Sequence, residues 1–408
     1  GLPKTPGAVP KDVYATAFWA RSTDYLARMA AALGKDAEAR EFEEEARLVR
    51  EAFNSKYLDP ETNHYPGRTQ CANLIPLYFG IVPDDRVRAV AQNVVDDIVA
   101  RRGHLSTGFL GTGYINPVLT LTGHHDLAWL LATQTTYPSW GYMCKKGATT
   151  IWELWNSDTA GPGMNSRNHF CLGSVGEWFY ESLAGIEPAE PGFRRIVIHP
   201  RPVGSLKWVK ASRETLYGTI VSNWRLEDGD FILNAVIPPN TGAIIFVPTF
   251  GKKDAPITEG AKPADQAEGV TLIDRSRAGA VFGVGAGEYE FRARGVGTPP
   301  VLKYNIPPPP PVIENVQDDF SGPIDDQKWE LLDLGLESFE PQGMSASSGG
   351  GKLTISGKTS VNYWSGKTLL SRGAFTVPPD KKLEISVKRG ALKAEGTGAR
   401  AGILLWVD

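Results

Sequence analysis

The hydrophobic periodicity of this chain changes once, at Gly185. Between residues 12 and 186 the apolar side chains recur every three to four residues, which is typical of helices with one buried face. After Gly185, short runs alternate apolar and polar residues and are rich in β-branched side chains, as strands are. The two periods require different backbones, so the sequence predicts a multidomain chain in which a helical region precedes a β-region.

The helical region divides into hairpins. In the first segment Phe18, Tyr25 and Met29 share one helical face, and Gly34 ends the segment. A second amphipathic segment follows at once, so we expect the two to pack together. Serial hairpins with short loops fit either an α-solenoid or a closed helical toroid, and periodicity does not choose between them. Further helices are predicted over residues 71–79, 84–102, 113–121, 125–134 and 173–183.

The β-region is predicted to form an antiparallel sandwich, because turn residues separate its short strands. Residues 299–311 contain seven prolines, a composition that favours an extended polyproline II spacer. Strand patterns return beyond it, so we place the domains at 1–187, 188–296 and 315–408, with the spacer at 297–314. Strands are expected over residues 195–199, 205–211, 216–223, 231–237, 242–248 and 288–293.

Composition narrows the kind of ligand. The net charge is −3 and charged residues make up 22%, so there is no basic footprint for nucleic acid. No apolar run reaches the roughly 20 residues of a membrane span. Cys71, Cys144 and Cys171 fit neither a disulfide framework nor a zinc signature, and we expect all three in the core. A neutral ligand, with no metal and no cofactor, is therefore expected.

The chemistry is expected between Tyr137 and Trp178. Glu153 stands in the run Ile151-Trp152-Glu153-Leu154-Trp155, and a carboxylate among such apolar neighbours is costly to bury. It is either a functional group or a core residue satisfied by an arginine or a helix N-terminus, and the pattern favours neither. Downstream, Asn168-His169 could present a donor to a ligand hydroxyl, although a single histidine is more often structural. Ser174 and Glu177 match a capping box and are assigned to a helix start.

Several ordered motifs together resemble the bacterial α-L-rhamnosidases of glycoside hydrolase family 78. The resemblance covers about residues 6–293 and implies a partial (α/α)6 toroid followed by a β-sandwich. The motifs are Tyr137-Pro138-Ser139-Trp140, Gly147-Ala148-Thr149-Thr150-Ile151-Trp152-Glu153, Met164-Asn165-Ser166 with Asn168-His169, and Gly173-Ser174-Val175-Gly176-Glu177-Trp178.

The resemblance also implies roles for individual residues. Glu153 corresponds to the base that activates water in an inverting hydrolysis, and His169 to a residue that contacts rhamnose hydroxyls. Trp140 is similar in position to an aromatic residue of the sugar pocket, and Trp152 and Asn168 complete the predicted substrate-binding set. Inversion needs a second carboxyl group, about 6.5 to 9.5 Å away, to protonate the leaving oxygen. The implied partner is a rhamnose-containing glycoside or polysaccharide.

One family feature is missing from the sequence. The general acid of the family lies in a segment that begins near Cys-Pro-Gln-Arg-Asp-Glu, and nothing like it occurs here. We therefore expect this chain to be a fragment, weakly active or inactive alone. Two alternatives stay open: a glycan-binding or structural protein that turns nothing over, and another (α/α)6 glycosidase or a polysaccharide lyase. The sequence does not specify the aglycone.

The last module begins with a short resemblance, at residues 318–329, to a truncated concanavalin- or laminin-G-like sandwich. Trp329, Tyr363 and Trp364 are candidate glycan platforms there, although core packing explains each of them as well. Such modules and proline-rich spacers are common in exported polysaccharide-degrading enzymes. Secretion or a periplasmic location is thus suggested only by analogy at the level of fold.

Overall fold

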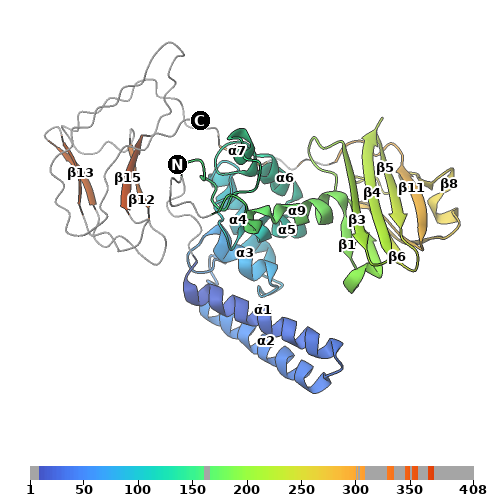
Figure 1. The fold of residues 1–408 in the computed structure, drawn as a ribbon, viewed down its shortest axis with the longest axis horizontal. Helices are drawn as coiled ribbons and strands as arrows, with labels where there is room; N and C mark the ends of the chain where they lie inside the picture. The colour runs from blue at the N-terminus through green and yellow to red at the C-terminus, as the bar shows by residue number, and fades with distance from the viewer. Residues whose placement is uncertain are drawn as a thin grey trace, which may run out of the picture. The chain divides into compact units, whose positions relative to one another are not determined.

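The computed structural model describes residues 9–159, 166–299, 301 and 304–307, together with the strand backbones at 329–334, 345–349, 352–356 and 366–371. The chain divides into two compact units, residues 6–307 and residues 1–5 with 308–408. In the first unit helices precede two β-sheets (Figure 1), which confirms the change in architecture that the periodicity predicts.

Helices α1 (Lys11–Ala32) and α2 (Asp36–Tyr57) form the predicted first hairpin. They pack through small side chains: Ala17, Ala20 and Ala27 of α1 are buried, as is Ala46 of α2. Small residues let two helix axes approach closely. The face predicted from the large apolar residues of α1 was wrong. Figure 1 shows the two helices side by side along their length, and the large residues mostly lie outside the contact, with 44% of Tyr25 and 59% of Met29 exposed.

The remaining helices are short. Thr69 caps α3, since its hydroxyl accepts a hydrogen bond from the Ala72 N–H over 3.1 Å. The single helix predicted over 173–183 is divided: α9 runs directly into a π-helix, which ends at Gly185 with φ of 78°. The bounds are α3 (Gln70–Tyr78), α4 (Val87–Ala100), α5 (Thr112–Leu121), α6 (His125–Thr133), α7 (Trp140–Lys145), α8 (Phe170–Gly173), α9 (Val175–Trp178) and the π-helix (Phe179–Ala184).

The predicted capping box is also wrong. Ser174 immediately precedes α9, but its side chain makes no cap hydrogen bond. Its hydroxyl instead donates to the carbonyl oxygen of Cys171 over 2.6 Å, because α8 ends at Gly173 and leaves that carbonyl without a helical partner.

The β-region consists of two sheets. One has the strand order β1-β2-β6-β10-β9 and the other β3-β4-β5-β11-β7-β8. Neighbouring strands of these two sheets pair antiparallel, except that β2 pairs with β6 in parallel. The bounds are β1 (Ile186–Pro188), β2 (Arg195–Ile198), β3 (Trp208–Thr215), β4 (Gly218–Glu227), β5 (Asp230–Ile237), β6 (Gly242–Pro248), β7 (Ile257–Glu259), β8 (Lys262–Pro263), β9 (Val270–Arg275), β10 (Gly279–Val284) and β11 (Gly287–Ala293).

Inward-facing residues of both sheets share one hydrophobic core. Phe282 of β10 stacks on Phe291 of β11, with the ring centroids 5.1 Å apart, so aromatic packing joins the two sheets. The sequence patterns do not predict β9 and β10, nor the short strands β1, β7 and β8. Residues 270–275 end in charged side chains, and residues 279–284 contain two glycines, which weaken a strand pattern.

The helical and β-regions meet at the end of the π-helix. The hydroxyl of Ser222 donates to the carbonyl of Ala184 over 2.7 Å, and the Trp224 indole N–H donates to the carbonyl of Leu183 over 2.7 Å. Both donors lie on β4 and are buried. The last carbonyls of the helical region are therefore satisfied by the sandwich, which fixes where the sandwich starts.

The second unit contributes two antiparallel strand pairs. β12 (Trp329–Leu334) pairs with β15 (Gly366–Ser371), and β13 (Ser345–Gly349) pairs with β14 (Lys352–Ser356). Of the predicted glycan platforms, Tyr363 and Trp364 lie outside the described residues, as does the side chain of Trp329. That prediction therefore remains a prediction.

Candidate active site

The segments 150–153 and 166–169 are held together by hydrogen bonds. The Glu153 N–H donates to the carbonyl of Ser166 over 3.1 Å, and the His169 N–H donates to the carbonyl of Ile151 over 2.9 Å. The hydroxyl of Thr150 also donates to the carbonyl of Arg167. These backbone contacts bring the predicted base and the predicted sugar-binding histidine to the same place.

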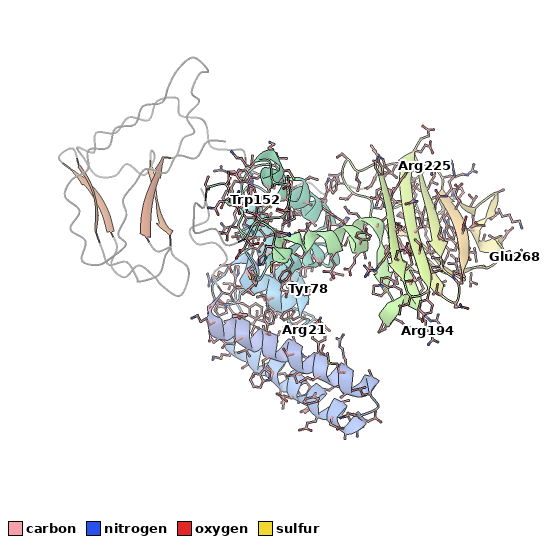
Figure 2. All side chains as sticks on the ribbon, viewed as in Figure 1. Arg21, Tyr78, Trp152, Arg194, Arg225 and Glu268 are labelled. Carbon is pink, nitrogen blue, oxygen red and sulfur yellow. The ribbon has the colours of Figure 1, made fainter. Side chains whose placement is uncertain are left out.

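Three buried tryptophans, Trp140, Trp152 and Trp155, lie in the core that carries these two segments. The indole N–H of Trp140 donates to the carbonyl of Leu172 over 2.8 Å, and that of Trp155 donates to the carbonyl of Thr107 over 2.8 Å. The rings of Trp140 and Trp155 pack edge to face, 5.2 Å apart. Trp152 lies in the same core, within the helical region labelled in Figure 2. The exposed fractions of Trp140 and Trp152 are only 7% and 6%, so little of either ring is open to a ligand.

The Glu153 side chain is half-buried. In the described part of the chain its carboxylate has neither a hydrogen bond nor an ion pair. Among those residues, no arginine and no helix N-terminus pairs with the Glu153 carboxylate. The described part of the chain therefore does not support the interpretation of Glu153 as a paired core residue. Burial raises the pKa of the neighbouring Cys171 thiol, and the negative charge of Glu153 raises it further. The carboxylate thus lies near a thiol that stays protonated.

His169 has one ring nitrogen committed and one open. It is the N-cap of α8, where its Nδ1 accepts a hydrogen bond from the Cys171 N–H over 3.3 Å. An accepting Nδ1 carries no proton, so in the neutral ring the proton sits on Nε2. The ring can therefore donate a hydrogen bond from Nε2 to a ligand. The neighbouring Asn168 side chain is exposed, while its backbone is fixed by Ser166.

Two exposed phenylalanines flank His169, and the sequence analysis missed both. Phe109 is 55% exposed and Phe170 is 79% exposed. The Phe109 ring lies 5.2 Å from the His169 ring, and Phe170 stacks on His169 at 5.2 Å. No motif in the sequence marks Phe109. For Phe170 the signal is its position directly after the Asn168-His169 motif.

Other candidate groups are structural or separate. Cys71 and Cys171 are buried as expected, but Cys144, on α7, is exposed, so the prediction of a core position was wrong for it. Across the described residues, no set of three or more His, Cys, Asp or Glu side chains is arranged to hold a metal ion. The helices that the structure describes include none with the length and apolarity needed to cross a membrane.

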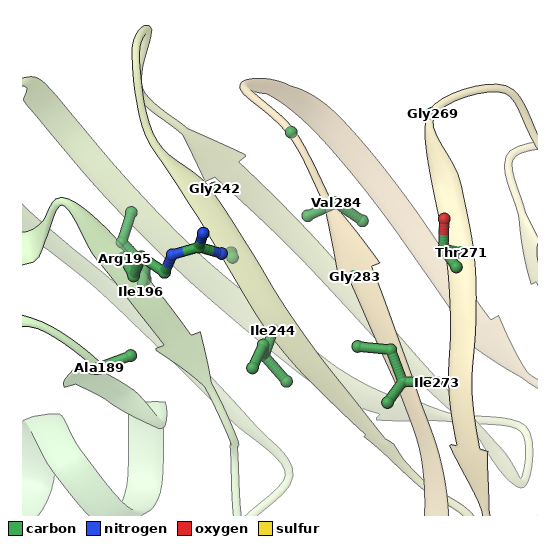
Figure 3. A pocket seen from close by; sticks show the side chains of 12 residues that line it. Ala189, Arg195, Ile196, Gly242, Ile244, Gly269, Thr271, Ile273, Gly283 and Val284 are labelled. Carbon is green, nitrogen blue, oxygen red and sulfur yellow. The ribbon is translucent and has the colours of Figure 1, made fainter.

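A depression of about 390 Å³ lies on the face of the five-stranded sheet (Figure 3). Its floor is formed by glycines and by Ile244 and Ile273, and Arg195 is its one charged side chain. It contains no carboxylate and no histidine, so it offers no group for acid or base catalysis. The predicted residues Glu153 and His169 lie elsewhere, in the helical part of the chain.

Two family models match successive parts of the chain. Residues 4–183 match the family described as the bacterial alpha-L-rhamnosidase 6 hairpin glycosidase domain. Residues 185–262 match the bacterial alpha-L-rhamnosidase C-terminal domain. The boundary between the two matches falls at residues 183–185, where the periodicity changes and the π-helix ends.

Curated proteins and solved structures that are similar to this chain are named as alpha-L-rhamnosidases. An alpha-L-rhamnosidase of Streptomyces avermitilis is 41% identical over 69% of this chain and 27% of its own length. One of Formosa agariphila is 33% identical over 71% of this chain and 31% of its own length. Among solved structures, the Streptomyces avermitilis enzyme complexed with L-rhamnose aligns with a TM-score of 0.64 and 38% identity, over 71% of this chain and 28% of that one. The enzyme of Dictyoglumus thermophilum aligns with a TM-score of 0.65 and 36% identity, over 71% and 33%.

Proposed function

Because residues 4–262 of this chain belong to the bacterial α-L-rhamnosidase family, we propose that the protein takes part in the hydrolysis of terminal α-L-rhamnosides with inversion of configuration. The observation that carries the proposal is the pairing of residues 150–153 with 166–169. It brings together the segments of a carboxylate that has no partner among the described residues and of a histidine whose Nε2 can donate. Rhamnose offers several hydroxyls, and groups of this kind can bind them through hydrogen bonds.

Glu153 is assigned as the general base. An inverting glycosidase needs a carboxylate that removes a proton from a water molecule on the face opposite the leaving group. A carboxylate already paired with an arginine would be a weaker base, because the positive charge stabilises its ionised form. Glu153 has no such partner among the described residues, and the Ser166 carbonyl fixes its backbone.

His169 is assigned as a substrate-binding donor. Its Nδ1 is occupied by the Cys171 N–H, which leaves Nε2 to donate to a rhamnose hydroxyl. For Trp140 and Trp152 we propose contact through the small part of each ring that remains exposed, with packing as the larger contribution. Asn168 is proposed to bind the sugar through its exposed amide.

The general acid is proposed to come from a part of the protein outside this chain. The chain spans 27% and 31% of the length of the two curated relatives described above. Glu153 activates the water in this scheme, and a second carboxyl group protonates the aglycone oxygen as the glycosidic bond breaks. General acid catalysis is typically worth about 10²- to 10⁴-fold in rate. We therefore expect this chain by itself to be weakly active or inactive.

The test is hydrolysis of an aryl α-L-rhamnoside, measured through the release of the phenol. Proton NMR determines the anomeric configuration of the first sugar product. It compares the full-length protein, its Glu153→Gln variant and this chain alone. Glu153→Gln should lower kcat by about 10²- to 10⁴-fold, whereas Glu177→Gln, an exposed carboxylate on α9, should leave it unchanged. Full activity in Glu153→Gln would refute the base assignment. An inert full-length protein that still binds rhamnose would identify a glycan-binding protein instead.

A further inference from the structure

We propose that Phe109 and Phe170 form an aromatic ledge beside His169 that binds an apolar ring of the aglycone, so that the protein favours aryl or benzyl rhamnosides over simple alkyl ones. The proposal rests on the proposed function, because it assigns a second subsite to the same site. The two residues come from different places in the chain: Phe109 lies between α4 and α5, and Phe170 begins α8.

The ledge is contiguous with the catalytic region. Phe170 and His169 stack almost parallel, with an interplanar angle of 14° and centroids 5.2 Å apart. Phe109 meets both rings at an angle, 58° to His169 and 69° to Phe170. The three rings therefore form a corner with two open apolar faces. Because His169 is joined to the Glu153 segment by backbone hydrogen bonds, this corner borders the place where the sugar would react.

The loop that carries Phe109 is held in position by hydrogen bonds. Gln70 accepts from the Ser106 N–H over 2.6 Å and donates to the carbonyl of His104 over 3.2 Å. The Trp155 indole N–H then donates to the carbonyl of Thr107, two residues before Phe109. Trp155 lies two residues after Glu153, so one side chain ties the loop directly to the catalytic segment. A ring held this way loses little further freedom when a ligand binds.

The chemistry of the ledge favours an apolar ring. A phenylalanine face offers no donor or acceptor, so it attracts an apolar ring without providing hydrogen bonds that would select a second sugar. Exposed fractions of 55% and 79% are costly for two adjacent phenylalanines in water. Covering them with an aromatic ring recovers that cost and adds ring–ring attraction, which is worth roughly 3- to 10-fold in affinity.

The experiment uses benzyl and ethyl α-L-rhamnoside with the full-length protein, because the two leaving groups have similar acidity and differ by a phenyl ring. The measured quantity is the ratio of kcat/KM for the benzyl substrate to that for the ethyl substrate. We expect Phe109→Ala and Phe170→Ala each to lower this ratio by roughly 3- to 10-fold. Phe179→Ala removes another exposed phenylalanine, 41% exposed on the π-helix, and should preserve the ratio.

Each other outcome overturns the proposal in a recognisable way. If both ledge variants keep the wild-type ratio, the ledge does not bind the aglycone, although rhamnosidase activity stands. If they instead lower turnover of a rhamnosyl disaccharide and keep the benzyl-to-ethyl ratio, the subsite holds a sugar. If neither rhamnoside is bound or hydrolysed by the wild type, the proposed function itself fails, and the ledge assignment fails with it.

Discussion

Acidification should destabilise the helical region through His125, which begins α6. Both of its ring nitrogens are used when the ring is neutral. The Trp178 indole N–H donates to the Thr120 hydroxyl over 2.8 Å, and that hydroxyl lies 2.9 Å from Nδ1 of His125. Nε2 lies 3.0 Å from the carbonyl of Arg201, to which it donates. A second proton on the ring would disrupt this chain of bonds, so we expect the folded protein to resist protonation there.

The size of the effect follows from the pKa. The pKa of His125 is lowered from 6.5 to about 4, mainly by burial. The hydrogen bond to the Arg201 backbone opposes this shift, and the positive charge of Arg201 adds to it. A histidine with a depressed folded-state pKa binds fewer protons when folded. Its contribution to stability is present above pH 6.5 and is lost as the pH falls toward 4. Between pH 7.5 and pH 4.5 this amounts to about 2.5 kcal/mol.

The assay is urea unfolding followed by tryptophan fluorescence, which is sensitive at this place because Trp178 lies 5.5 Å from the His125 ring. The free energy of unfolding is compared at pH 7.5 and pH 4.5 for the wild type and His125→Gln. The wild type should lose about 2.5 kcal/mol more than the variant over this interval. His64→Gln, at a half-exposed histidine in a loop, should stay closer to the wild type. Equal pH dependence in the wild type and His125→Gln would show that this ring does not control acid stability.

Two further substitutions test the packing that surrounds the site. Gly185→Ala should lower the free energy of unfolding by more than about 2 kcal/mol in thermal unfolding, because its Cβ would lie 2.1 Å from a backbone carbon after β2. The control Gly34→Ala, with a similar φ and open space, should lower it by about 1 kcal/mol. Similar losses in the two variants would contradict the clash. Trp155→Phe should lower the free energy of unfolding by about 1 to 3 kcal/mol, since it leaves the carbonyl of Thr107 without its buried hydrogen bond. The control Trp208→Phe, at a 60% exposed residue, should change the free energy of unfolding little. Equal losses would contradict the role of that bond.

Periodicity predicted the fold class well and one helix face badly. The change at Gly185 locates the boundary between helices and strands because it follows from backbone geometry alone. The face of α1 could not be chosen in this way. That helix has a stripe of large residues, including Tyr25 and Met29, and a second stripe of alanines, and either can be buried. The alanine stripe is the buried one, and it packs in the same region as the larger buried side chains of α2, such as Val49 and Phe53. Only the partner helix determines that choice.

The site could be predicted only in part for a related reason. Glu153 and His169 lie 16 positions apart, and motif spacing drew attention to both. Phe109 lies 44 positions before Glu153 in a loop with no polar motif, so no local pattern marks it. Its place beside His169 depends on the bond from Trp155 to Thr107, which is a tertiary contact. Sequence patterns identify groups that are chemically unusual, and the fold decides which ordinary residues stand next to them.

Counting the hydrogen bonds of each polar atom separates structural from functional residues where their types alone do not. His125 uses both ring nitrogens within the protein, so it has nothing left to offer a ligand. His169 uses one, and its remaining nitrogen is a donor beside a half-buried carboxylate. The indole N–H groups of Trp140 and Trp155 are likewise committed to carbonyls. Glu153 differs from these groups, because among the described residues its half-buried carboxylate has no hydrogen-bond or ion-pair partner. Burying a carboxylate without a partner is costly, and for that reason the Glu153→Gln variant is the most direct test of the proposed function.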